Sequence, residues 1–212
     1  MLTLQGVGWW TRKAIGLATV TLDIEQYQAP PEGAPDTDAP VTHVDIKQTA
    51  TGGIKGLLSS PSSRYKDYFP RATIHTMRSL TCDDITGSTE FRSFDWVRRQ
   101  RNDPVFGHCA GQTRWATLPA AADLDPALSP DDAEFFSEGW LDGDNEKGGP
   151  NGERFMESFV INEERGWTAR QIWGFAEING ERRYVRRVVS WKTGGEEVRR
   201  VRLVFNFLGK GA

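Results

Sequence analysis

The stretch that decides the fold is GFAEINGERRYVRRVVSWKTGGEEVRRVRLVFNF, residues 174–207. It contains two dipeptides that are typical of tight hairpin turns. Asn179-Gly180 is the strongest short signal for a two-residue turn of type I′, and Gly194-Gly195 predicts a second turn of the same length. Because a two-residue turn fixes which residues oppose each other, the stretch predicts three consecutive antiparallel strands in a defined register.

The first turn pairs Trp173 with Arg186, and the second pairs Arg186 with Leu203. Directly opposed residues share one face of a sheet, and successive residues alternate between the faces. One face is therefore aromatic and apolar, and it carries Trp167, Ala169, Gln171, Trp173, Phe175, Tyr184, Arg186, Val188, Val201, Leu203, Phe205 and Phe207. The other face carries most of the arginines, among Thr168, Arg170, Ile172, Ala176, Arg183, Val185, Arg187, Val189, Arg200, Arg202 and Asn206. We predict that the first face is enclosed and that the second is a solvated arginine stripe.

Arg186 is the exception on the apolar face. A buried guanidinium without a partner is costly, so it requires an internal carboxylate, an anionic ligand group or water. Glu157 in RFMESFV is the expected partner if Phe155, Glu157 and Phe159 point inward. A ligand group is the other interpretation, and the two can coexist.

The rest of the chain also alternates with a period of two. The segments LATVTLDIEQ (17–26) and VTHVDIKQTA (41–50) place apolar residues on one face and polar residues on the other, as strands do. A helix of about two turns is expected only in SPDDAEFFSEGW (129–140). Ser129 is a favourable N-cap there, and Pro130 suits the first helical position.

Residues 57–87 interrupt this alternation. The segment is polar, contains proline and shows no clear period. A loop of this length is unusual in a compact domain. We predict a single domain over residues 1–212 in which 57–87 is an insertion, either a lid over a pocket or a passive loop.

Composition excludes several classes of protein. The chain has 26 Lys and Arg against 29 Asp and Glu, a net charge of −3, which disfavours a nucleic-acid partner. No apolar run is long enough to span a membrane. The first residues do not resemble a signal peptide, and Cys82 and Cys109 lie in dissimilar surroundings. We therefore expect a cytoplasmic protein with reduced cysteines, and the sequence does not indicate its oligomeric state.

Cofactor and metal motifs are missing from the sequence. It contains no phosphate-binding loop, dinucleotide fingerprint or Gly-x-Ser-x-Gly elbow. His43, His75 and His108 are far apart, and no Cys-x-x-Cys spacing occurs. We therefore expect no cofactor and no metal. His108 falls on a predicted strand in phase with Phe106 and Ala110, so it is a candidate for an inward position.

The segment GVGWW (6–10) carries a family resemblance. Gly8-Trp9-Trp10 matches the Gly-x-Trp that begins the first strand of lipocalins and is similar to a feature of fatty-acid-binding proteins. Together with the hairpin ladder, the chain resembles a lipocalin-like (calycin) barrel. The resemblance implies an all-β, antiparallel up-and-down barrel of about eight to ten strands around a cavity for a small hydrophobic molecule. It also implies that Arg186 and Tyr184 anchor an anionic head group.

Two functions remain open. The first is a cytosolic protein that binds a small hydrophobic molecule; the residues expected to contact it are Gln171, Trp173, Tyr184, Arg186, Leu203 and Phe205. The second is a cofactor-free isomerase, dehydratase or cyclase that acts on a polyketide- or terpenoid-type intermediate, a role that several lipocalin-like barrels fill. In that enzyme Arg186 or Tyr184 would polarise a carbonyl, and Glu157 or His108 would move a proton. A polyanion-binding arginine stripe is a third interpretation.

Overall fold

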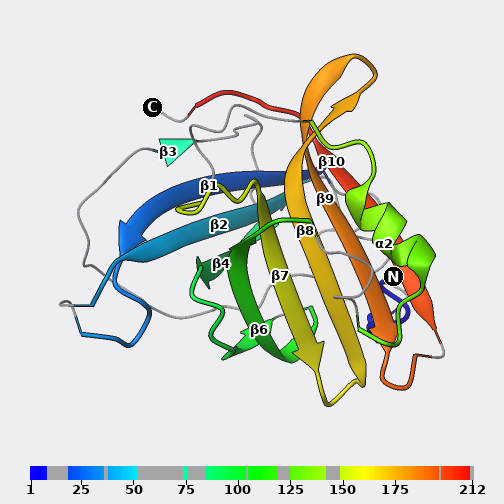
Figure 1. Cartoon of the computed structure of the whole chain (residues 1–212). Helices are drawn as coiled ribbons and strands as arrows, with labels where there is room; N and C mark the ends of the chain where they lie inside the picture. The colour runs from blue at the N-terminus through cyan, green and yellow to red at the C-terminus, as the bar shows by residue number, and fades with distance from the viewer. Residues whose placement is uncertain are drawn as a thin grey trace. The chain divides into compact units, whose positions relative to one another are not determined.

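The computed structural model of the chain describes part of its length: residues 1–8, 19–35, 38–51, 74–75, 85–103, 105–118, 125–141, 149–195 and 197–210. These ranges hold ten strands and one short helix (Figure 1). They fall into two compact units. One unit consists of Met1–Gly6 and Phe94–Phe207, and the other consists of Val7–Ser93 and Leu208–Ala212.

The second of these units contains a four-stranded antiparallel sheet. Its order is β3-β1-β2-β4, with β1 at Thr19–Ala29, β2 at Val41–Thr51, β3 at Ile74–His75 and β4 at Ile85–Ser93. Leu22, Val44 and Ile46 are buried, and Ile46 is paired with Ile24 across the strands. The period of two that predicted both long strands is therefore confirmed.

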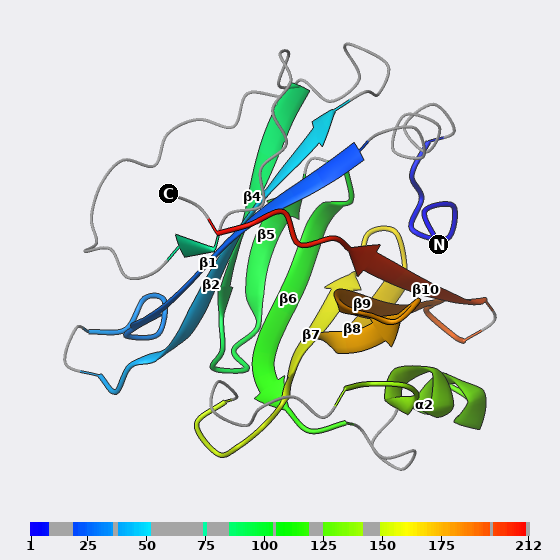
Figure 2. The same ribbon diagram turned by 90° about the horizontal axis from the view of Figure 1, so that it is seen from above.

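The first unit contains a six-stranded sheet in which each strand pairs with the next along the chain. The strands are β5 (Arg99–Asp103), β6 (Gly107–Ala116), β7 (Phe155–Asn162), β8 (Trp167–Ile178), β9 (Glu181–Lys192) and β10 (Val198–Phe205). All of the pairings are antiparallel, and Figure 2 shows the strands following one another across the sheet. The prediction of an all-β, antiparallel, up-and-down protein with one short helix is confirmed.

Both predicted hairpin turns are present. Asn179 and Gly180 have φ of 53° and 78°, and Gly194 and Gly195 have φ of 98° and 76°. Positive φ at these positions is the reason why glycine and asparagine are favoured there. The register follows as predicted, since Arg186 is paired with Trp173 on one side and with Leu203 on the other.

The aromatic face of this sheet is enclosed along β8 and β9. Trp167 and Val188 form a buried cluster with Leu4 from the N-terminal segment of the same unit. Trp173 is 1% exposed. Towards the margin of the sheet this face is open to solvent, as the 40% exposure of Phe175 shows.

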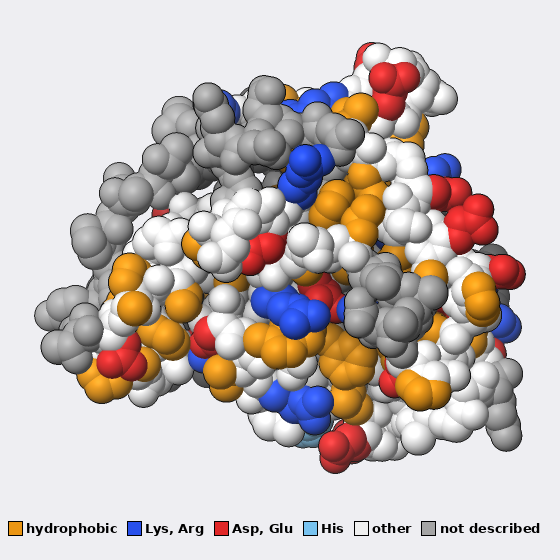
Figure 3. All heavy atoms as spheres, viewed as in Figure 1, with side chains coloured by type: hydrophobic (Ala, Val, Ile, Leu, Met, Phe, Trp, Pro, Cys, Tyr) orange, Lys and Arg blue, Asp and Glu red, His pale blue; other side chains and the backbone are white. Residues whose placement is uncertain are grey.

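The opposite face is not the solvated arginine stripe that the sequence predicted. Helix α2 (Pro130–Ser137) packs against β9 on this side. Phe136 of the helix forms a buried cluster with Ile172 and Val189. Arg170 and Arg187 are buried as a result, whereas the arginines of β10 on this face are exposed. On the side seen in Figure 3, Lys and Arg side chains lie as separate groups among hydrophobic and acidic ones.

Arg187 joins the helix to the sheet. Its Nη1 donates a hydrogen bond of 2.7 Å to the carbonyl oxygen of Phe135, and its guanidinium lies 4.5 Å from the centre of the Trp140 ring. Burial lowers the pKa of Arg187. The helix carbonyl and the ring compensate part of the loss of water, while Nε of Arg187 has no hydrogen-bond partner among the described residues.

Helix α2 begins as predicted, with Ser129 before Pro130. The carboxylate of Asp132 accepts hydrogen bonds from the N–H of Ser129 (2.7 Å) and from its hydroxyl (2.8 Å). It also accepts one from Nε of Arg200 on β10 (2.6 Å). Burial by itself would raise the pKa of Asp132, but these hydrogen bonds outweigh burial and hold the pKa below its ordinary value.

Asp132→Asn is therefore expected to lower the free energy of unfolding at pH 7 by about 1 kcal/mol. A carboxyl whose pKa is lowered by folding adds stability above its unfolded pKa and loses it as the pH falls through the folded pKa. The difference between wild type and variant should thus shrink below the ordinary aspartate pKa of 3.8. Urea unfolding at pH 7 and pH 3 measures it. Asp131→Asn, at a side chain 79% exposed, is the control, and an equal loss in both variants would contradict the prediction.

Two sequence predictions lie mostly or wholly outside the described residues. The motif Gly8-Trp9-Trp10 runs into residues 9–18, which the structure does not describe. Within 57–87, the structure describes only Ile74–His75 and the start of β4 at Ile85. Both predictions stay predictions. No helix in the described ranges has the length and apolar character needed to cross a membrane.

Candidate functional site

The aromatic face of the six-stranded sheet holds a group of side chains that we call the Arg186 cluster: Trp173, Tyr184, Arg186 and Phe205. Strands β8, β9 and β10 each contribute to it, because the two tight turns bring these positions side by side. The Cζ atom of Arg186 lies 4.1 Å from the centre of the Trp173 ring, 5.6 Å from that of Phe205 and 5.8 Å from that of Tyr184. Rings at these distances stabilise a guanidinium without neutralising its charge.

Arg186 is 5% exposed, and its Nε and Nη2 atoms have no hydrogen-bond partner among the described residues. Nε–H and Nη2–H point the same way along one edge of the guanidinium plane. This is the edge that binds a carboxylate or a carbonyl oxygen through parallel hydrogen bonds. Buried donors that lack a partner are rare in folded proteins and call for an explanation. A polar ligand atom at this edge would supply the missing partner.

The other residues expected to contact a ligand adjoin this cluster. Gln171 accepts a hydrogen bond of 3.3 Å from Nε1 of Trp173. Leu203 is paired with Arg186 across the strands, but 41% of its surface is exposed. The structure thus brings Trp173, Tyr184 and Phe205 around Arg186, with Gln171 behind the tryptophan and Leu203 at the margin.

The expected ion pair between Glu157 and Arg186 is not formed, and this prediction is wrong. Asn162 is paired with Trp167 at the β7–β8 turn, which pairs Glu157 with Ile172. This register places Glu157 on the face opposite Arg186. The turn between the two strands contains four residues. A turn of this length does not fix which residues pair across it, so the sequence did not determine which face of the sheet Glu157 occupies.

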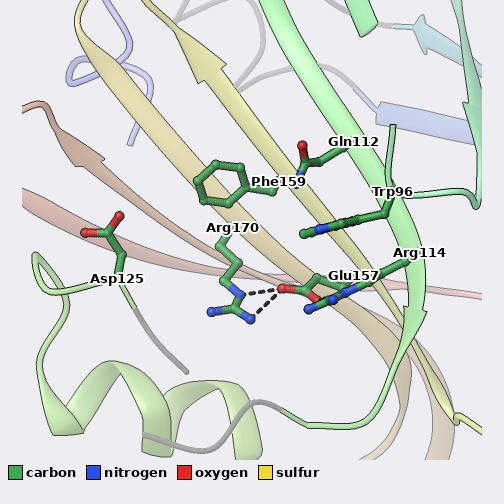
Figure 4. Close-up of a pocket in the computed structure, with 7 residues that line it drawn as sticks. All are labelled: Trp96, Gln112, Arg114, Asp125, Glu157, Phe159 and Arg170. Carbon is green, nitrogen blue, oxygen red and sulfur yellow. Dashed lines mark hydrogen bonds and ion pairs between the residues drawn. The ribbon is translucent and has the colours of Figure 1, made fainter. Parts of the chain in front are cut away.

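Glu157 instead lies at the base of a cavity of about 300 Å³ on the helix-bearing face, which we call the Glu157 pocket. Figure 4 shows its lining residues, which are Trp96, Gln112, Arg114, Asp125, Glu157, Phe159 and Arg170. Oε1 of Glu157 is 2.6 Å from Nε and Nη2 of Arg170, and Oε2 is 2.7 Å from Nε of Arg114. Glu157 is 2% exposed, so its carboxylate is held almost wholly by these two arginines.

Trp96 covers the Arg114 side of this pocket. Its φ of 58° lies in the left-handed region, which is uncommon for a bulky residue. The ring centre lies 4.1 Å from Cζ of Arg114. The carboxylate of Asp95 fixes the segment, since it accepts the N–H of Val97 (3.0 Å) and pairs with Arg99 (2.6 Å).

Sequence reasoning did not find the Glu157 pocket. Trp96 lies in an irregular segment between strands, where a period of two gives no orientation. Arg170 was assigned to a solvated stripe, and Arg114 was not singled out. The register of β7 against β8 is the signal that would have placed Arg170 beside Glu157.

His108 is exposed on β6, where it is paired with Asn102. The structure does not bring it to the Arg186 cluster, and its role in moving a proton stays a prediction. No group of His, Cys, Asp and Glu is placed to hold a metal ion within the ranges that the structure describes.

The fold and these sites define an all-β antiparallel protein with buried arginines that lie beside aromatic rings. No family model and no solved structure matches the chain. Two curated proteins are similar to it along nearly its whole length. Pericyclase pydY of Acremonium sp is 27% identical over 212 residues, which cover 100% of this chain and 84% of the relative. The probable pericyclase scpY of Mollisia scopiformis is 27% identical over 209 residues, which cover 99% of this chain and 81% of the relative.

Proposed function

We propose that this protein is an enzyme that catalyses a cofactor-free, pericyclic cyclisation of a hydrophobic natural-product intermediate at the Arg186 cluster. The observation that carries the proposal is the guanidinium edge of Arg186, which is buried and has no partner for Nε and Nη2 among the described residues. The similarity to two pericyclases supports an enzyme over a protein that only binds. The lipocalin-like barrel is part of the proposal, supported by the six-stranded sheet, in which the strands follow one another in chain order.

A pericyclic reaction suits this set of residues. Its bonds break and form in one cyclic movement of electrons, without an external proton, hydride or cofactor. An enzyme accelerates such a step by holding the reacting ends together and by stabilising charge that develops on a conjugated carbonyl. Arg186 would donate two hydrogen bonds to that carbonyl, and Trp173, Tyr184 and Phe205 would pack against the flat apolar remainder.

A dehydration is less well supported. It requires an acid and a base that move protons, and Glu157 lies on the opposite face of the sheet from Arg186. The rings recorded beside the Arg186 guanidinium belong to Trp173, Tyr184 and Phe205. A concerted cyclisation uses this mainly aromatic environment without further groups.

Native mass spectrometry of the protein purified from its own source tests the proposal. We expect a small molecule to co-purify with the protein. This molecule should be either the substrate or the product of a cyclisation. Substrate and product are isomers of identical mass, and chromatography separates them when excess of the molecule is incubated with the protein. A product lighter by one water would favour a dehydratase instead. A ligand that returns unchanged after many equivalents, with no isomer formed in either direction, would overturn the enzyme and leave a binding protein.

A further inference from the structure

We propose that the Glu157 pocket is a second ligand site, independent of the Arg186 cluster, and that it binds a small flat aromatic carboxylate. The two sites lie on opposite faces of the same sheet, since Arg170 and Glu157 belong to the face under helix α2 and Arg186 to the other. The pocket therefore needs an explanation of its own.

Two arginines share the carboxylate of Glu157 at the base of the pocket. One oxygen is bound to Arg114 and the other to Arg170. Asp125 also lines the pocket, but Figure 4 shows it at the end away from Trp96 and Arg114. One oxygen of Asp125 accepts the N–H of Ala127 (2.9 Å) in the approach to the helix.

Arg114 is the cation that an incoming anion can reach. Its side chain is 44% exposed, whereas that of Arg170 is 9% exposed. Its Nε is bound to Glu157, and neither Nη atom donates to another residue among those that the structure describes. The Nη atoms of Arg114 are thus donors for a carboxylate at the mouth of the cavity.

The Trp96 ring is fixed in position over Arg114, where a flat ligand could stack on it. A left-handed conformation of a bulky residue is energetically costly, and such residues cluster at functional sites. Here the Asp95 carboxylate, the Arg99 guanidinium and the hydrogen bond from Trp96 N to Thr113 O (3.0 Å) keep the indole over Arg114. A ring that is fixed before the ligand arrives loses little conformational freedom on binding.

The size and lining of the cavity limit the ligand. At about 300 Å³ the cavity lies at the lower end of the range for small-molecule sites. Phe159 and Trp96 supply apolar surface, and the amide of Gln112 supplies a polar group on the wall (Figure 4). An aromatic acid of one or two rings matches this combination of one positive end and two flat apolar walls.

Calorimetric titration of the full chain with 2-naphthoate and with the neutral 2-naphthamide tests the site. These probes share their rings and differ in charge. We expect naphthoate to bind about tenfold more tightly than the amide, as one charge-assisted contact would require. Arg114→Met should remove this preference, and Arg114→Lys should keep part of it. Trp96→Leu should weaken both probes.

Arg186→Met separates this site from the Arg186 cluster, which also offers a guanidinium to a carboxylate: the variant should retain the naphthoate binding that depends on Arg114. Near-UV circular dichroism checks that each variant is folded. The Arg114 variants are expected to fold because this side chain is 44% exposed. Absence of binding by wild type at millimolar probe, equal affinities for the two probes, or loss of binding in Arg186→Met but not in Arg114→Met would each overturn the proposal.

Discussion

Replacing Arg186 by methionine is expected to leave the protein folded, and at least as stable, while lowering its affinity for its ligand about a hundredfold. The two effects have one origin. A guanidinium that is 5% exposed and lacks partners for two of its nitrogens among the described residues opposes folding, so its removal should not lower the free energy of unfolding. Methionine has a similar length, and its sulfur packs well against aromatic rings such as Trp173.

Urea unfolding and native mass spectrometry measure these effects separately. Arg182→Met is a matched control on the same strand. Arg182 lies 3.7 Å above the Phe175 ring and is therefore also a cation on an aromatic face, but it is exposed. This variant should retain both ligand and stability. A loss of several kcal/mol in Arg186→Met would instead mean that Arg186 has a structural partner, and the proposed anchor would be wrong.

Glu157→Gln is expected to lower the free energy of unfolding by about 3–5 kcal/mol, the loss typical of removing one partner from a buried ion pair. Arg170 has little access to water when this carboxylate is lost, because its side chain is 9% exposed. Arg114 is 44% exposed and can turn outward. The loss therefore comes mainly from the charge of Arg170, left buried beneath the helix-bearing face.

Chemical denaturation at pH 7 measures this loss, with Glu177→Gln at an exposed position of β8 as the control. A second substitution, Arg170→Met, should recover much of the stability because it removes a buried charge that has lost the Glu157 carboxylate. If Glu157→Gln costs less than about 1 kcal/mol, or if the double variant is no more stable than the single one, the buried pair is not the source of stability.

Local signals in the sequence were sufficient for much of the fold. The pairing of Trp173 with Arg186 depends on a two-residue turn that leaves no freedom of register. Ser129 and Pro130 located the helix because an N-cap and a first-turn proline act within a few residues. The aromatic content of one face predicted its enclosure for the same local reason, and the prediction holds for Trp173 and Val188 but not for Phe175 and Leu203 at its margin.

Contacts between distant segments account for what was missed. Helix α2 packs over Arg187 and Val189, although the sequence of β9 alone does not indicate that a helix packs against it. The valines and the isoleucine between the arginines of this face could have indicated that it is partly buried, since a fully solvated face does not require apolar residues. The longer turn before β8 left the phase of Glu157 open, and the left-handed Trp96 follows no repeating pattern.

The two tight turns have a consequence for how the molecule assembles. They make most contacts of β8, β9 and β10 local along the chain, and local contacts shorten the conformational search. These hairpins are thus able to form before the helix docks, while Arg187 is still hydrated. Desolvation of that arginine then belongs to a late step, so changes at the helix–sheet seam should speed unfolding while leaving the folding rate nearly constant.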